Sequence, residues 1–402
     1  MAKPPKRSEV QIALGLTAAL LFVVVVLLTA VLDGARRFDF TSFYTGGLIL
    51  RQGNAARLYD LGEQARIQRQ LFNRGNLIYL HPPFEALFFA ALARFSYIKA
   101  YVLWGAINVL FWLFFQHLLR PHTPIPRNPI RYFWLCSLFF PLWTALFQGQ
   151  TTVLVLVLFS LTFVCLKRGQ DFRAGVFLGL GLCKFPLVLP FALICLLRSK
   201  WKLMAGFAAA ATLLGVLSII AVGPVGVRSY ANLLIDIVRN PDNPTYGIIK
   251  ASAMPTVKGF FATILTGRLT TVDISMFAAA VSAPIVLFAA WRWRQEDRCR
   301  GPNSLSLMFA AALAVSQVTA PYLFMSDLTL MLLAVLLVIG SPQWSENSGQ
   351  RVVLTAIIVI LYCPPVYALL LSRQAVYILA PVLVAFALAA ISLARKAELP
   401  LT

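Results

Sequence analysis

The chain has 402 residues, of which 59% are hydrophobic and only 12% are charged, and its formal net charge is +20. A soluble protein of this length carries roughly a quarter charged residues, so the composition excludes a soluble, disordered, collagen-like or coiled-coil protein. The basic residues form short clusters between apolar runs, which is typical of the cytoplasmic loops of membrane proteins and argues against nucleic-acid binding.

Apolar runs of near membrane-spanning length recur along the sequence and predict an all-α polytopic membrane protein, with residues 1–402 as one domain. The first run, Ile12–Leu32, follows three basic residues. It is longer than a signal-peptide core and lacks a small-residue cleavage site, so we expect a retained helix that starts in the cytoplasm. We expect about twelve transmembrane helices with both termini in the cytoplasm. The outer surfaces of these helices are expected to contact membrane lipids.

Two long polar segments are expected outside the membrane, at residues 33–82 and 223–271. The first external loop holds two moderately amphipathic stretches, about Thr41–Arg51 and Leu61–Phe72, which predict interfacial helices. The second contains an expected interfacial helix near Tyr230–Arg239. Between them, the apolar run Phe84–Phe95 is too short to span comfortably, so it is expected to be re-entrant or interfacial.

The middle of the chain suggests short and broken helices. Tyr132–Phe147 and Thr151–Leu166 are expected to form two helices joined by a polar turn. Ala174–Leu197 is interrupted by Lys184-Phe185-Pro186 and has basic residues beyond both ends. It therefore predicts a hairpin of two short helices with Lys184 near its outer tip, an arrangement that usually lines a cavity. Further spans are expected at about Lys202–Val222, Val272–Trp291, Ser304–Ala320, Leu323–Ile339, Val352–Leu371 and Ala375–Leu393, with a basic loop at Arg292–Arg300.

Charged side chains beside a membrane are costly and often functional. Asp39 follows the first expected helix and is either a general base at the mouth of a cavity or a solvated carboxylate. Asp33, nearer the helix end, is expected to be interfacial. His81 could donate to a phosphate or sugar oxygen or simply hold a turn, and Glu85 could complement the dipole of the next helix.

Other polar residues are expected at the same face. Gln148 and Gln150 flank Gly149 and suit sugar hydroxyls, although two amides could also cap a helix hairpin. The ammonium of Lys184, inside an apolar hairpin, needs an anion or a water-filled cavity. Four further candidates for substrate binding are less clearly marked: Lys250 and Lys258, which could hold a phosphate or be solvated, and Tyr322 and Asp327, which open a late span.

Motifs for other chemistries do not occur. The chain has no P-loop, dinucleotide-binding, nucleophile-elbow or metalloprotease motif, and its six cysteines lack metal-binding spacing. We therefore expect no cofactor or metal ion, and no use of ATP or a nucleotide sugar.

Several segments, in order, resemble glycosyltransferase family 87, which belongs to the GT-C superfamily of membrane glycosyltransferases. They are Asp39-Phe40-Thr41-Ser42-Phe43-Tyr44, Leu58-Tyr59-Asp60, His81-Pro82-Pro83, Trp104 with Asn108, Gly149-Gln150, Ala174-Gly175, Lys184-Phe185-Pro186 and Tyr322–Leu328. The chain departs from the family pattern at His81, where the family usually has tyrosine, and in the late His-x-Tyr-Asp-Leu motif, whose histidine is missing.

This resemblance implies a GT-C-like fold and an inverting, metal-independent enzyme. It would transfer a hexose, typically mannose, from a polyprenyl-phosphate donor to a lipid or glycan acceptor, with Asp39 as the base. The active site would face the periplasmic side of a bacterial inner membrane. A transporter or flippase of lipid-linked sugars is the alternative, although it should show internal repeats that the sequence lacks. A lipid-linked oligosaccharide polymerase or ligase is a third reading, but such enzymes usually place their long external loops late in the chain.

Overall fold

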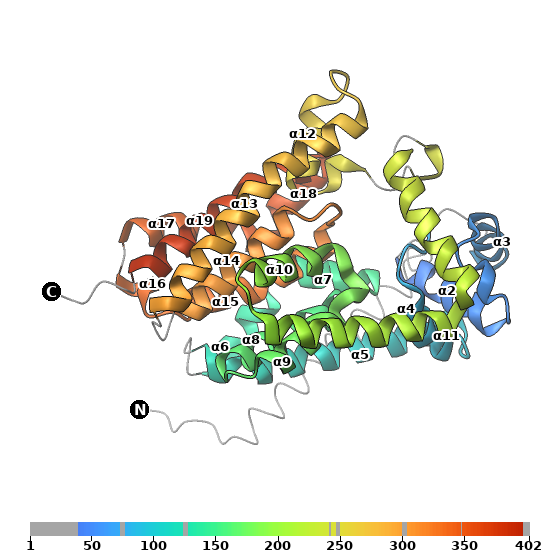
Figure 1. The fold of residues 1–402 in the computed structure, drawn as a ribbon, viewed down its shortest axis with the longest axis horizontal. Helices are drawn as coiled ribbons and strands as arrows, with labels where there is room; N and C mark the ends of the chain where they lie inside the picture. Colours follow the sequence, from blue (N-terminus) through green and yellow to red (C-terminus); the bar gives the residue numbers. More distant parts are fainter. Residues whose placement is uncertain are drawn as a thin grey trace.

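The computed structural model describes residues 39–72, 77–123, 128–240, 243–246, 250–299, 304–346 and 348–396. The expected first span Ile12–Leu32 and Asp33 lie outside these ranges. Within the described residues the chain is almost entirely helical and contains no strand (Figure 1). The fold class predicted from the sequence, an all-α polytopic protein, is therefore confirmed for this part of the chain.

The first external loop forms two helices, α2 (Phe40–Arg51) and α3 (Leu61–Phe72), as the sequence predicts. Asp60 caps α3, because its Oδ1 atom accepts hydrogen bonds from the backbone N–H groups of Gly62 and Glu63. The next helices are α4 (Pro83–Leu92), which has only ten residues, and α5 (Tyr97–Leu119). A cluster of buried aromatic rings joins α2, α4 and α5: Phe40, Phe43, Tyr44, Tyr79, Phe89, Tyr97, Tyr101 and Trp104.

Two predicted single helices are broken in the structure. The expected helix Tyr132–Phe147 consists of α6 (Pro129–Ser137) and α7 (Phe140–Gln148), which meet at 67°. The expected span Val352–Leu371 consists of α17 (Ser348–Tyr362) and α18 (Pro364–Ser372), bent by 66° where the two helices meet. Neither helix is continuous, and the reason is the same: a proline lies in the first turn of the second helix, and proline cannot continue the hydrogen-bond pattern of the first.

The predicted hairpin with Lys184 at its tip is present. It follows α8 (Thr152–Lys167) and consists of α9 (Asp171–Leu180), the 3₁₀ turn η4 (Gly181–Lys184) and α10 (Phe185–Leu197). This stretch would be long enough for one span. However, Gly175 lies against Leu203 and Gly179 against Ala210, so α9 runs parallel to the start of the next helix. Because α9 and α11 start side by side, α10, which connects them in the sequence, must run in the opposite direction.

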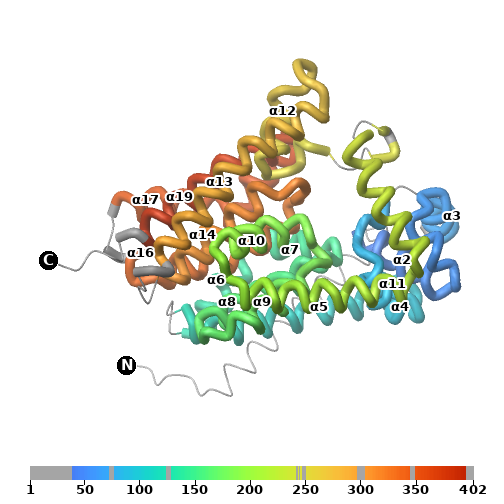
Figure 2. Tube along the Cα trace, in the orientation of Figure 1, coloured from blue at the N-terminus to red at the C-terminus, as the bar shows by residue number. Residues whose placement is uncertain are grey.

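That next helix, α11 (Trp201–Arg239), extends along much of the molecule and bends sharply (Figure 2). The bend lies at Gly223, whose φ of 69° and ψ of 174° are not helical, and Pro224 begins the second part. A positive φ is accessible to glycine without steric cost. The second part packs near the first external loop, with Gly226 beside the carbonyl of Ala55. The helix predicted near Tyr230–Arg239 is therefore the end of α11.

The C-terminal half contains the most deeply buried helices. Almost every side chain of α14 (Ser304–Val318) and α15 (Met331–Ile339) is buried. The remaining long helix, α13 (Thr271–Cys299), continues through Arg292 and Arg294, so the basic loop expected at Arg292 begins later than predicted. The other elements are η2 (Ala55–Arg57), η3 (Arg120–His122), η5 (Pro244–Tyr246), η6 (Ala251–Ala253), α12 (Val257–Leu265), η7 (Met325–Leu330), α16 (Gln343–Glu346), η8 (Val376–Ile378) and α19 (Leu379–Lys396).

Five helical stretches of the described chain are long and apolar enough to cross a membrane, or up to seven if each bent pair is one span. Four shorter apolar helices accompany them: Pro83–Leu92, Thr152–Lys167, Ser304–Val318 and Met325–Ile339. Large apolar side chains such as Ile220 and Met276 are exposed on α11 and α13, as expected of helices that face lipid. The molecule is therefore a polytopic membrane protein.

The close packing of α9 on α11 generates a stability prediction. A Cβ at Gly206 would lie 2.0 Å from the carbonyl oxygen of Phe172, which is backbone and cannot move aside cheaply. Gly206→Ala should therefore lower the thermal midpoint in detergent, at a cost of about 1–3 kcal/mol. Gly215→Ala in the same helix is the matched control, because a Cβ there meets nothing within 4 Å. Equal midpoints for the two variants would contradict this packing.

Candidate active site

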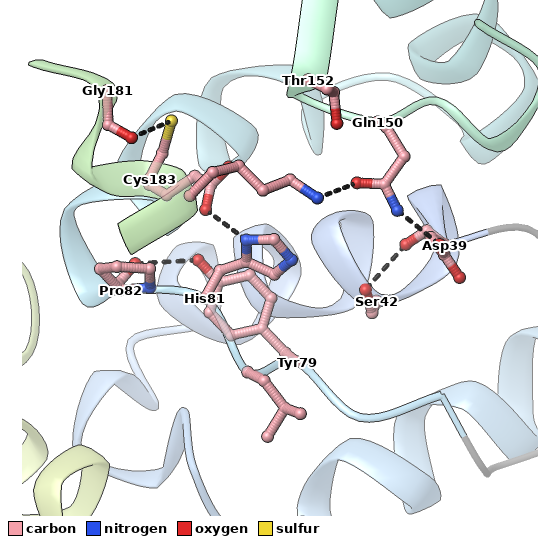
Figure 3. A network of polar contacts seen from close by, with 12 residues as sticks. Asp39, Ser42, Tyr79, His81, Pro82, Gln150, Thr152, Gly181 and Cys183 are labelled. Atoms are coloured by element: carbon pink, nitrogen blue, oxygen red, sulfur yellow. Dashed lines mark hydrogen bonds and ion pairs between the residues drawn. The ribbon is translucent and has the colours of Figure 1, made fainter. Parts of the chain in front are cut away.

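Polar side chains from four separate parts of the chain meet where helices begin or break. Asp39 precedes α2, Gln150 lies between α7 and α8, Lys184 ends the 3₁₀ turn of the hairpin, and Asp327 lies in η7. Figure 3 shows Asp39 and Gln150 joined by a hydrogen bond, with the ring of His81 nearby. The backbone at helix ends is free to turn, so short segments can bring these side chains together.

Asp39 occupies the N-cap position of α2, although its side chain does not cap the helix. Its backbone carbonyl accepts hydrogen bonds from both the N–H and the hydroxyl of Ser42. The carboxylate is therefore free to point away from α2. The next residue, Phe40, is fully buried in the aromatic cluster and fixes the start of the helix.

Gly149 allows the turn before α8 to approach Asp39. Its φ is +64°, and a Cβ at this position would lie 2.8 Å from Cβ of Phe40. Only glycine satisfies both constraints without strain. The indole N–H of Trp104 donates to the Gly149 carbonyl at 2.7 Å and holds the turn from the other side. These contacts place the next residue, Gln150, directly against the carboxylate.

The Gln150 side chain connects Asp39 to Lys184. Its amide Nε2 donates to Oδ2 of Asp39 at 2.5 Å, and its Oε1 accepts from Nζ of Lys184 at 2.6 Å. An ammonium group can only donate hydrogen bonds, so Lys184 fixes which end of the amide faces Asp39. Both ends of the Gln150 amide are therefore hydrogen-bonded to protein groups, and its predicted contact with a sugar hydroxyl stays a prediction.

Lys184 and Asp327 form an almost fully buried ion pair, with 3.0 Å between Nζ and Oδ1 and side-chain exposures of 11% and 6%. The same Oδ1 accepts from the Thr152 hydroxyl at 2.9 Å, and Oδ2 accepts from the backbone N–H of Phe324 at 3.0 Å. A buried ion pair is tolerated when further hydrogen bonds satisfy its oxygens. Asp327 therefore holds the lysine in place.

Burial governs the charge of Asp39. It raises the pKa of this carboxyl, and the nearby ammonium of Lys184, the Gln150 hydrogen bond and His81 offset part of the effect. The pKa remains above its usual value, so the ionised carboxylate is a stronger base than an exposed aspartate. A general base works best when its pKa approaches the working pH, and this environment moves Asp39 in that direction.

The other predicted site residues are more scattered. Nζ of Lys258 lies 4.5 Å above the ring of Tyr322, which packs at the edge of the aromatic cluster. Burial lowers the pKa of Lys258. Lys250 is exposed at the start of η6, and Gln148 is the half-buried last residue of α7. The structure thus brings Asp39, Gln150, Lys184 and Asp327 into one hydrogen-bonded chain and adds Thr152, which sequence analysis missed. The only feature of the sequence that marks Thr152 is its hydroxyl at the start of an apolar helix.

No group of three or more His, Cys, Asp or Glu side chains is placed to hold a metal ion within the described ranges. Among the described residues, the cations near Asp39 are Lys184 and, when protonated, His81. These groups could stabilise an anion close to the carboxylate.

A family comparison decides the identity. The model of glycosyltransferase family 87 matches residues 79–321, more than half of the chain. The chain belongs to glycosyltransferase family 87. It is thus a membrane glycosyltransferase. No curated protein and no solved structure gives a significant match. His81, Gln150 and Lys184 lie within the matched segment, while Asp39 and Asp327 lie outside it and are hydrogen-bonded to it.

The buried ion pair generates a second prediction. Lys184→Met should lower the free energy of unfolding by about 3–5 kcal/mol, because it leaves the charge of Asp327 buried and unpaired. The double variant Lys184→Met/Asp327→Asn should recover part of this loss, since the neutral amide needs no counter-charge. Thermal unfolding in detergent would measure both. If the double variant were less stable than Lys184→Met alone, the pairing would not account for the loss.

Proposed function

We propose that this family 87 glycosyltransferase transfers a hexose, specifically mannose, from a polyprenyl-phosphate donor to a lipid or glycan acceptor. We further propose a GT-C-like arrangement of about twelve transmembrane helices, with the active site on the periplasmic side of a bacterial inner membrane. The observation that carries the proposal is the carboxylate of Asp39, aimed by Gln150 and made more basic by burial.

The proposed reaction is a single displacement. The acceptor hydroxyl attacks the anomeric carbon of the sugar while the bond from that carbon to the phosphate oxygen breaks. Asp39 orients the hydroxyl and accepts its proton. One of the carboxylate oxygens, Oδ2, is occupied by Gln150, so Oδ1 is the oxygen that would receive the proton. One displacement inverts the configuration at the anomeric carbon.

The departing phosphate gains negative charge as its bond to the sugar breaks. Positive groups fixed in advance near that charge lower the barrier, because they need not reorganise during the reaction. Lys184 fits this role, since Gln150 and Asp327 take only two of its three N–H groups. Lys258 and Lys250 are further phosphate-binding candidates. The proposed reaction requires no metal ion or cofactor, as the family resemblance implies.

The proposed orientation rests on the arrangement of the elements. α2, α3 and the end of α11 lie at one end of the molecule, and α6, α16 and α17 lie at the other (Figure 1). The active-site residues belong to the elements of the first end or to helix termini directed toward it. Basic residues after α8, after α10 and near the end of α13 fit a cytoplasmic face at the opposite end.

Asp39→Asn should abolish transfer while the protein remains folded and still binds donor. The exchange is nearly isosteric, but an amide cannot accept the hydroxyl proton. General bases typically contribute about 10²–10⁴-fold, so the rate should fall at least about a hundredfold. The measurement is turnover by purified protein with polyprenyl-phosphate-mannose and extracted membrane lipids, with products identified by mass spectrometry.

The matched control is Asp60→Asn. Asp60 lies in the same loop, but its carboxylate caps α3, and asparagine is an equally good cap. If Asp39→Asn kept more than about a tenth of the wild-type rate while Asp60→Asn lost activity, the base would be misassigned. If the wild-type protein transferred no sugar from any polyprenyl donor but moved such lipids across vesicles, the flippase alternative would replace the proposal.

The proposed orientation makes a topological prediction. Single cysteines replacing Asn54 and Asn243 should both react with an impermeant thiol reagent added to the periplasmic side, whereas a cysteine replacing Arg294 should react only from the cytoplasmic side. The background should have the six native cysteines replaced. Labelling of Asn54 and Asn243 positions from opposite sides would contradict the layout.

A further inference from the structure

His81 and Glu85 form a second cation–carboxylate pair beside Asp39, which the mechanism above does not use. The distance from Nδ1 of His81 to Oε2 of Glu85 is 2.8 Å, and their side chains are 19% and 5% exposed. Neither oxygen of Glu85 has a well-aligned hydrogen bond within the described chain, so the contact is an ion pair rather than an ideal hydrogen bond. Since Nδ1 faces the carboxylate, Nε2 is the nitrogen left for a substrate.

The backbone around His81 is held by three phenol groups. The hydroxyls of Tyr230, Tyr59 and Tyr79 donate to the successive carbonyls of Leu80, His81 and Pro82, at 3.3, 2.7 and 3.1 Å respectively. Tyr59 and Tyr230 come from other parts of the chain, and Tyr79 belongs to the segment itself. The extended segment is therefore fixed without any contribution from the imidazole, so the ring is not needed to anchor it.

The imidazole itself is aimed at the active site. Its ring packs on that of Phe43, with 4.4 Å between centroids, and Phe43 lies one helical turn after Asp39. In Figure 3 the ring of His81 lies between Pro82, on the left of the view, and Ser42 and Asp39, on the right. It is also close enough to Asp39 for a direct electrostatic effect on that carboxylate.

A carboxylate behind an imidazole is the arrangement that orients catalytic histidines. It favours one tautomer and stabilises the ring when it carries a second proton. Imidazole titrates near neutrality, and a phosphate monoester takes up its second proton at about pH 6. Proton exchange between the two groups is therefore close to balanced. The ammonium of Lys184, held by Gln150 and Asp327, offers charge but is a poor proton donor.

We propose that His81, positioned by Glu85, is a second proton-handling residue that protonates the oxygen of the departing phosphate. This inference rests on the proposed function. The acceptor oxygen bonds to the anomeric carbon, whose bond to the phosphate oxygen breaks. The acceptor proton passes to Asp39, and the Nε2 proton of His81 passes to the phosphate oxygen. Water then removes the proton from Asp39 and returns one to His81.

The surroundings of the pair limit what else could titrate there. Within the part of the chain that the structure describes, the charged and titratable groups close to His81 or Glu85 come from several elements. They are Asp39 of the N-cap of α2, Lys184 and Cys183 of η4, Tyr59 after η2, Tyr79 of the same segment and Tyr230 of α11. The phenols and the thiol are buried. Burial raises the pKa of Tyr59 and of Tyr79. Asp39, whose pKa is also raised by burial, lies in the same place. A proton-dependent change is therefore assigned to His81 only where His81→Gln removes it.

The first test is the pH dependence of sugar transfer. The wild-type rate should fall at alkaline pH, where His81 loses the proton it donates. His81→Gln should lose this alkaline limb and, at neutral pH, react about 10²–10⁴-fold more slowly. Glu85→Gln should keep the limb but displace it to lower pH, because the imidazolium loses its counter-charge. Glu63→Gln is the matched control, since Glu63 of α3 is buried to a similar degree and is paired with Arg66. It should leave the profile unchanged.

The second test does not need turnover. Farnesyl phosphate, a soluble prenyl phosphate, is titrated into wild-type and His81→Gln protein in detergent by calorimetry. The wild type should bind more tightly at about pH 6, and the two affinities should converge at about pH 9, where the imidazole is neutral. The comparison cancels the titration of the phosphate itself. Thermal unfolding of His81→Gln shows that it is folded.

The outcomes separate the two proposals. Transfer by the wild type, together with an unaltered alkaline limb in His81→Gln and equal affinities at every pH, would overturn the role of His81 and leave the proposed function standing. No transfer from any polyprenyl donor, together with the expected loss of pH-dependent binding in His81→Gln, would support His81 as the proton-linked phosphate contact and overturn the proposed function.

Discussion

The candidate site depends on one side chain, the amide of Gln150, which lies between a carboxylate and an ammonium. Its two ends have opposite polarity, so it can bind Asp39 and Lys184 at once only in one orientation. Lys184 is in turn fixed by Asp327. The chain of hydrogen bonds therefore links the first external loop, the α7–α8 turn, the hairpin tip and η7. Every proposed catalytic role requires that these four segments keep their positions.

That arrangement is possible because helices begin, end or break where these four side chains meet. Prolines restart α7 and α10, glycine allows the turn before α8, and a 3₁₀ turn forms the tip of the hairpin. Continuous membrane helices would bury their backbone groups and leave no polar end facing a substrate. Broken helices instead expose helix termini and turns inside the membrane protein, where a cavity or neighbouring protein can satisfy their backbone groups.

The charges near Asp39 form two pairs with different properties. Lys184 and Asp327 are both nearly buried and hydrogen-bonded, so their positions are fixed. His81 and Glu85 are less well aligned, and the histidine is partly exposed. Imidazole groups as a class exchange protons near neutral pH, whereas ammonium groups do not. One pair therefore suits steady electrostatic stabilisation of a phosphate, and the other suits proton exchange with it.

The sequence by itself determined the helical membrane class, both helices of the first external loop, the end of the first part of α11 at Gly223 and the hairpin at Lys184. These features follow from local signals: apolar run length, amphipathic spacing, glycine and proline positions, and paired basic ends. It also marked Asp39, Lys184 and Asp327 as unusual charges. It could not give their partners, because Gln150 lies 111 residues from Asp39 and Asp327 lies 143 residues from Lys184. Only tertiary packing decided which end of the Gln150 amide faces Asp39. It also placed the Thr152 hydroxyl against Asp327. The His81–Glu85 pair is different, because its two residues are only four apart and the contact is local. The contacts of Asp39, Lys184 and Asp327 instead depend on the approach of distant segments, and no local sequence pattern encodes that approach.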